Sequence, residues 1–169
     1  MFTSDNLISK LAKNNLYFQI TIQHPSDSVF FLSVDYGKIS VRNVALDPSG
    51  NWAEICGFGE VLNPTYPGEL TIHFPFSPPG DYWVLDTDYD NFASVYACTD
   101  VLGITKIEFA WILVRDVDNI SYDSINRALN AFKTQNLSTE YFQPVAQVGC
   151  TYENPSGADP CTPGRDWGN

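Results

Sequence analysis

Eight strand-like segments constrain the fold of this chain more than any other feature. Each combines β-branched and aromatic residues in period-two alternation, and clusters of Gly, Pro, Asn, Asp and Ser separate them. We predict strands at 16–23, 28–34, 38–46, 52–61, 69–74, 82–87, 92–98 and 106–115. This pattern is typical of an antiparallel barrel or sandwich. Because sheets must protect their edges and eight strands can close on themselves, a barrel would leave an interior able to hold one small ligand.

One helix is predicted after the last strand, at 121–135. Its apolar residues recur at positions i, i+4 and i+7, as on the buried face of an amphipathic helix. These residues are Ile125, Leu129 and Phe132. Ser121 or Asp123 can cap the first turn with a side-chain oxygen. We therefore expect an all-β domain with one C-terminal helix.

Length and charge bound the remaining organisation. A chain of 169 residues suits one domain, which we place at 1–150, followed by a Pro- and Gly-rich C-terminal extension at 151–169. The net charge of −11 and the pI near 4.3 argue against nucleic-acid binding. We interpret the acidity as a means of solubility, with an acidic docking surface as the alternative. No apolar run approaches the roughly 18 residues of a membrane span.

An acidic run in the middle of the chain has the D-x-D-x-D spacing with which a calcium loop begins. Asp86, Asp88 and Asp90 form it. Such a loop needs a glycine at its sixth position and a bidentate carboxylate at its twelfth, where this chain has Asn91 and Ala97. The flanks are rich in strand-forming residues instead of helix formers. The run therefore predicts a β-hairpin with no metal site.

Signals for catalysis are weak. The chain has no G-x-S-x-G, H-E-x-x-H or C-x-x-C motif, and His24 and His73 are its two histidines. His73 alternates out of its strand and is interpreted as an exposed surface histidine. We predict that the protein is not an enzyme.

Cysteines and glycosylation patterns bear on the compartment. Cys56, Cys98, Cys150 and Cys161 allow three full pairings. Asn119 and Asn136 each begin an N-x-S glycosylation pattern. The first fifteen residues contain no apolar segment of a secretory signal. A secreted protein would thus have lost its signal before this sequence starts, or would begin elsewhere.

Two motifs carry a resemblance to a known family. Thr87-Asp88-Tyr89 lies at the predicted hairpin, and FAWILVRD, which ends the last strand, contains Arg115. Together with the element order, they resemble the lipocalins over about 16–150, most closely the branch that holds apolipoprotein D and the insect bilin-binding proteins. The resemblance implies an eight-stranded antiparallel up-and-down β-barrel with one α-helix packed outside. It makes the acidic run a structural hairpin at the closed end of the barrel.

The chain also departs from this family. The G-x-W motif of the first strand, whose Trp covers the barrel floor beneath the arginine, is replaced by Asn15-Leu16-Tyr17. The Tyr17 ring can still take the Arg115 guanidinium by cation–π contact. The partners that the family's two disulfides would require for Cys98 and Cys150 are absent. We favour a pairing of Cys150 with Cys161.

The resemblance also implies which residues face the barrel interior, because Arg115 points inward and side chains alternate along each strand. We expect the ligand to contact Ile72, Phe74, Tyr82, Val84, Val95, Phe109, Trp111 and Leu113. Also expected to face inward are Leu70, Ala93 and Ile107. Small residues should leave space for a ligand; these are Gly57, Gly59, Ala93 and Ala97. Ala110 should face outward and tolerate a polar residue.

The family resemblance implies a secreted carrier of a small hydrophobic ligand. No cofactor is required, but a bound chromophore is allowed for, either a biliverdin-like tetrapyrrole or a carotenoid. Such a pigment is the preferred ligand, because abundant aromatic residues suit stacking on a flat conjugated molecule. A steroid, a retinoid or a fatty acid is the other option, and a homo-oligomer is allowed for. The alternative function is a protein-interaction module with a filled barrel and an acidic surface.

Overall fold

The computed structural model describes residues 16–21, 29–31, 34–35, 38–46, 49 and 52–145. This part of the chain forms antiparallel strands and one α-helix. The strands are β1 (Leu16–Thr21), β2 (Val29–Phe31), β3 (Val34–Asp35), β4 (Lys38–Leu46), β5 (Trp52–Glu60), β6 (Glu69–His73), β7 (Gly80–Thr87), β8 (Phe92–Val101), β9 (Thr105–Val114) and β10 (Gln143–Pro144). The helix is α2 (Tyr122–Thr134).

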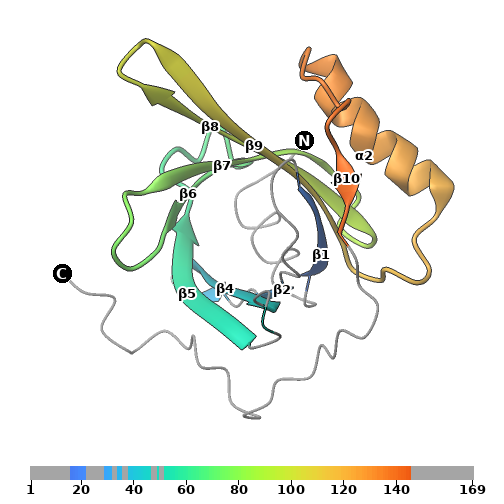
Figure 1. Cartoon of the computed structure of the whole chain (residues 1–169), viewed down its shortest axis with the longest axis horizontal. Helices are drawn as coiled ribbons and strands as arrows, with labels where there is room; N and C mark the ends of the chain where they lie inside the picture. The colour runs from blue at the N-terminus through green and yellow to red at the C-terminus, as the bar shows by residue number, and fades with distance from the viewer. Residues whose placement is uncertain are drawn as a thin grey trace.

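The described strands follow one another around a ring. Hydrogen-bonded neighbours run in the order β1-β2-β4-β5-β6-β7-β8-β9, with β3 beside β4 and β10 beside β1. β1 also pairs with β9, where Tyr17 lies opposite Val114 and Thr21 opposite Trp111, so the path returns to its start. Figure 1 shows these strands around a central space, with α2 outside them. The antiparallel β-barrel with an outer helix, expected from the sequence, is confirmed.

Two details differ from the predicted strands. The segment expected at 28–34 forms two short strands, β2 and β3, that pair with different parts of β4. The two-residue strand β10 was not predicted, because so short a pairing carries no periodicity and includes Pro144. The first half of β9, which precedes Trp111, pairs with β8 and not with β1, and this part of the β8–β9 ribbon projects past the ring (Figure 1).

Helix α2 begins and ends on local signals. Ser121 caps it, because its Oγ accepts a hydrogen bond from the Ser124 backbone N–H at 3.0 Å. Asn136 follows the helix with φ of 57°, a left-handed conformation that asparagine tolerates. The Leu137 N–H returns to the Phe132 carbonyl at 3.0 Å, which closes the last turn. The helix predicted at 121–135 is therefore present, with Ser121 as its cap.

A packed core lies between α2 and the outer face of β8 and β9. Its buried members are Phe92, Tyr96, Ala110, Ile112, Val114, Ala128 and Phe132. The Ser94 hydroxyl also donates to the Ala128 carbonyl at 2.9 Å, which ties the sheet to the helix. Ala110, expected to tolerate a polar residue, is only 3% exposed, because the core beneath the helix includes it. That expectation is corrected.

The acidic run forms the predicted hairpin between β7 and β8. Asp88 Oδ1 accepts hydrogen bonds from the backbone N–H groups of Asp90, Asn91 and Phe92. These bonds lower the pKa of Asp88 against the opposing effect of its partial burial, the largest single cause. Asp86 instead holds the Arg127 guanidinium of α2 at 2.7 Å. Within this hairpin, Asp88 thus stabilises the turn, and Asp86 binds the helix α2.

The two described cysteines are in different states. Cys56 is disulfide-bonded, whereas Cys98 has a free thiol. None of the three full pairings is therefore formed. Cys150 and Cys161 lie outside the described residues, and so does the pairing favoured for them. Cys98 lies on β8 at the edge of the helix-side core, half-buried.

Candidate functional site: a cavity inside the barrel

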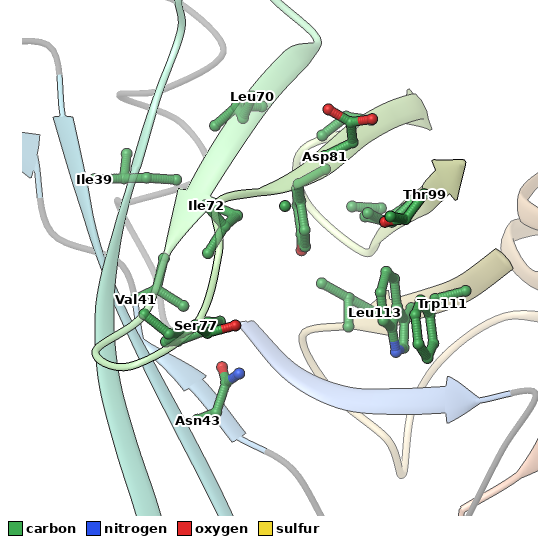
Figure 2. A pocket seen from close by; sticks show the side chains of 18 of the residues that line it. Ile39, Val41, Asn43, Leu70, Ile72, Ser77, Asp81, Thr99, Trp111 and Leu113 are labelled. Atoms are coloured by element: carbon green, nitrogen blue, oxygen red, sulfur yellow. The ribbon is translucent and has the colours of Figure 1, made fainter. Parts of the chain in front are cut away.

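The described strands enclose a cavity of about 220 Å³ on the inner face of the barrel. Side chains from β4, β6, β7, β8 and β9 reach it, together with residues that connect β6 to β7. Figure 2 shows Ile39 and Val41 on one side of this space, with Trp111 and Leu113 on the opposite side. The cavity therefore lies between two walls that are far apart in the sequence.

All eight residues expected to contact a ligand line this one cavity. They are Ile72, Phe74, Tyr82, Val84, Val95, Phe109, Trp111 and Leu113. Leu70, Ala93 and Ala97, also expected to face inward or leave space, line it too. Period-two alternation brings them together, because every second residue of a strand faces the same side. That these residues bind a ligand stays a prediction.

Three expectations about the interior were wrong. Gly57 and Gly59 do not line the cavity, because neighbouring side chains cover them. A Cβ on Gly57 would lie 2.5 Å from the Phe74 ring, and one on Gly59 would lie 2.6 Å from Ile72 Cδ1. These glycines therefore allow close packing and create no space. Ile107 is 46% exposed, because it lies on the part of β9 that projects past the ring.

Several lining residues were missed. From β4 come Ile39, Val41 and Asn43. The connection between β6 and β7 contributes Ser77 and Pro78, β7 contributes Gly80 and Asp81, and β8 contributes Thr99. The alternation of Ile39, Val41 and Asn43 was a usable signal, since the three residues occupy every second position of one predicted strand. The Pro-rich stretch before β7 has no periodicity, so only the structure places it at the cavity.

Three stacked aromatic rings form one wall of the cavity. The Phe109 and Trp111 rings are 5.7 Å apart and within 6° of parallel, and the Trp111 and Tyr82 rings are 6.1 Å apart at 21°. Such a row presents apolar aromatic surface to the interior. The wall can therefore contact a planar or elongated apolar molecule along its length.

Polar groups in the cavity divide into an exposed rim and a buried part. Ser77, Asp81 and Thr99 are exposed, so they lie where the cavity meets solvent. Tyr82 lies deeper, and burial raises the pKa of its phenol well above the usual value, so the hydroxyl stays protonated. The carboxamide oxygen of Asn43 is also buried. Among the lining residues in the described chain, Asp81 alone carries a charge.

The closed end of the cavity rests on the hairpin motif. Tyr89 packs against Ala93, Val95 and Leu113 beneath the interior. The Arg115 Nε donates to the Tyr89 carbonyl at 2.8 Å, and the Arg115 N–H donates to the Asn91 carbonyl at 2.9 Å. Burial lowers the pKa of Arg115, while Asp90 and Asp88 oppose that shift. Arg115 thus holds the turn that closes the barrel.

The expected stacking of Tyr17 on Arg115 stays a prediction. The Tyr17 side chain lies outside the described part of the chain. Its backbone pairs with Val114, the residue before Arg115, which threads the first strand beside β9 as expected. Thr87, the first residue of the hairpin motif, is 3% exposed, and its hydroxyl donates to the Phe92 carbonyl. The motif is thus a hydrogen-bonded structural unit.

Neither a metal site nor a histidine lies at the cavity in the described residues. No group of three or more His, Cys, Asp or Glu side chains could hold a metal ion within that part of the chain. His73 does not line the cavity, but it is half-buried instead of exposed. It stacks on Phe58 at 4.4 Å, with Nε2 3.0 Å from a Glu60 carboxylate oxygen. No described helix is long and apolar enough to cross a membrane.

Comparisons with known proteins identify the family of this barrel. Residues 10–147 match the model of the lipocalin-like domain. Apolipoprotein D of Mus musculus is 38% identical over 118 residues, which cover 69% of this chain and 62% of that protein. Apolipoprotein D of Macaca fascicularis is 32% identical over 115 residues, 68% of this chain and 60% of the relative. The matched chain therefore spans less than two thirds of these relatives.

Solved structures share the fold. Lobster apocrustacyanin A1 matches with a TM-score of 0.71 at 23% identity, covering 82% of this chain and 78% of that one. Insecticyanin of the tobacco hornworm Manduca sexta matches with a TM-score of 0.68 at 21% identity, covering 82% and 79%. With the domain match across most of its length and this barrel in place, the chain belongs to the lipocalin family, and apolipoprotein D is among its relatives.

Proposed function

We propose that this lipocalin carries a small hydrophobic ligand in the barrel cavity. The observation that carries the proposal is the interior space of about 220 Å³ with its row of stacked rings. Burial of apolar ligand surface would drive binding at about 25 cal/mol per Å². The buried phenol of Tyr82 would fix the orientation of the ligand. The alternative of a filled interaction module is the weaker proposal, because these side chains leave a space open.

A flat conjugated pigment, such as a bilin or a carotenoid, is the ligand class we prefer. The row of Phe109, Trp111 and Tyr82 rings supports it, because the row offers an extended aromatic surface along which a conjugated ligand can lie. The cavity is smaller than the roughly 300–1,000 Å³ typical of ligand sites. A pigment would therefore place one ring or chain end inside, and the remainder would extend past the rim at Asp81 and Thr99. A retinoid, steroid or fatty acid fits the same arrangement.

The test starts with the protein as purified. A visible absorption band, with a matching mass in an organic extract, would identify a bound pigment. Titration with biliverdin and with retinol should quench tryptophan fluorescence, and much of that quenching should vanish in Trp111→Phe. If every hydrophobic ligand leaves the fluorescence and the melting temperature unchanged, the carrier proposal is wrong.

We further propose that the protein acts outside the cell. The disulfide bond at Cys56 supports this, because such bonds persist in oxidising compartments. The glycosylation candidates Asn119 and Asn136 are both exposed. We also propose a barrel domain at 1–150 and a C-terminal extension at 151–169, and the family match over 10–147 supports the first of these. Mass spectrometry after glycosidase treatment of the secreted protein would test the sites.

A further inference from the structure

Asn43 is a polar exception on an apolar wall. It follows Ile39 and Val41 at every second position of β4, and all three side chains line the cavity. Figure 2 shows the Asn43 carboxamide turned into the space that Ile72 and Leu113 also face. Its Oδ1 atom is buried and has no hydrogen-bond partner in the described protein. The wall therefore presents one unpaired acceptor to the interior.

An acceptor in this state is costly unless something bonds to it. A buried polar atom left unpaired has lost its bond to water without a replacement, and native proteins pair the great majority of such atoms. An apolar residue at position 43 would continue the pattern of Ile39 and Val41 without that cost. By contrast, the hydrogen-bond acceptors at the rim of the cavity, on Ser77, Asp81 and Thr99, are exposed and can bond to water. Asn43 is thus placed for a partner that enters the cavity.

We propose that Asn43 selects ligands that carry a hydrogen-bond donor, a hydroxyl or an N–H group, on the part that enters the barrel. The inference rests on the proposed carrier function and narrows its ligand class. An alcohol or a pyrrole-type ring would pair with the Asn43 oxygen, while its apolar body lies against Trp111 on the opposite wall. A hydrocarbon, ether or ester of the same shape would leave that oxygen unpaired.

A matched ligand pair tests the selection. Retinol and retinyl methyl ether share the same polyene and differ in one donor. Both would be titrated into the wild-type protein, with quenching of tryptophan fluorescence as the readout. Retinol should bind about fivefold more tightly, the size expected for one neutral hydrogen bond. Asn43→Leu should abolish this preference by weakening retinol alone, and its unfolding midpoint should not fall, because a buried unpaired amide is removed.

Two control variants separate Asn43 from its neighbours. Tyr82→Phe removes the other buried hydroxyl of the cavity, and Thr99→Val removes a hydroxyl of the exposed rim. Tyr82→Phe can weaken both ligands together, because the phenol orients whatever binds, but both variants should keep the ratio of the two affinities that favours retinol. If the wild type binds the two ligands equally or prefers the ether, or if Asn43→Leu weakens both to the same extent, the inference is overturned while the carrier function stands. If neither of these ligands binds, and biliverdin, a steroid and a fatty acid also fail to bind, the carrier function itself fails.

Should Asn43→Leu not fold, Asn43→Val takes its place, since a β-branched side chain suits a strand. The equal-affinity result in the wild type overturns the inference without any variant. A preference for retinol that survives in Asn43→Val but is lost in Tyr82→Phe would assign the selection to the phenol and would also overturn it.

Discussion

The ribbon of β8 and β9 has two apolar faces, one packed against a helix and the other lining a cavity. On the outer face, α2 covers the strands, and Phe132 and Ala128 are fully buried against them. On the inner face, Phe109 and Trp111 keep partly exposed rings beside the cavity. Alternating residues of the same two strands thus end in a filled core or in a hollow one. The comparison shows that apolar side chains alone do not determine whether a strand face packs into a core or lines a cavity. The element that lies opposite that face determines it.

The physical difference is in how closely the opposing layer can approach. A helix is free to move against the sheet until its side chains interdigitate, and the hydrogen bond from Ser94 to Ala128 fixes that contact at 2.9 Å. The inner face has β4 opposite it, and β4 is bonded into the same ring. The number and tilt of the strands set the diameter of a barrel, so its walls cannot close onto each other.

The largest effect is expected from the filled face. Phe132→Ala should lower the free energy of unfolding by about 3–5 kcal/mol, because it leaves a cavity under the helix where Phe132 also contacts Phe142 at 4.9 Å between ring centroids. Urea denaturation would measure it, with exposed Lys133→Ala as the control on the same helix. A loss below 1 kcal/mol would mean that α2 is not the cover of this face.

The second-largest loss of stability is expected at the closed end of the barrel. Arg115→Ala removes the hydrogen bond to the Tyr89 carbonyl and should destabilise the protein by about 1–3 kcal/mol. Tyr17→Trp should be neutral or stabilising if its ring stacks on Arg115. Both are read from the denaturation midpoint. An unchanged midpoint in Arg115→Ala would argue against its role in closing the barrel.

The hollow face should respond in binding more than in stability. Trp111→Ala removes the central ring of the stacked wall and should weaken a bilin, retinoid or steroid by about tenfold or more, roughly 1.4 kcal/mol. Phe132→Ala, measured under conditions where it is folded, should bind nearly as the wild type does. If the two variants weakened ligand binding equally, the conclusion that only the inner face binds the ligand would be wrong.

The smallest expected effect is a pH dependence of the stability, which comes from one tyrosine on each face. Burial raises the pKa of Tyr82 inside the barrel and of Tyr96 outside, and a hydrogen bond to Glu108 adds to the shift of Tyr96. Above about pH 10 the unfolded chain releases these protons and the folded chain retains them. Stability present below that pH is therefore lost as the pH rises, by up to about 1.4 kcal/mol per pH unit for each group.

Denaturation between about pH 9 and 11 would measure this slope. Tyr82→Phe should flatten it, and Tyr96→Phe should do the same from the other face. A slope unchanged in Tyr82→Phe would show that water reaches the phenol freely, so that the hollow face is open to solvent at that depth.

Sequence periodicity was enough to locate most elements. The alternating segments became strands, and the stripe of Ile125, Leu129 and Phe132 became the packed side of α2, because these patterns reflect burial on one side. The eight expected contact residues share one cavity, although alternation needed the family arginine to tell inside from outside. Asn43 was missed, because a polar residue on a strand normally indicates the solvent side.

The sequence by itself determined which residues alternate together, where the turns fall and that a single helix follows the strands, since all of these depend on local backbone geometry. Only the tertiary structure decided that Ala110 is buried, that Phe74 and Ile72 cover Gly57 and Gly59, and that the Asn43 oxygen faces an interior space. Each of these depends on a second segment, distant in sequence, that the ring of strands brings opposite the first.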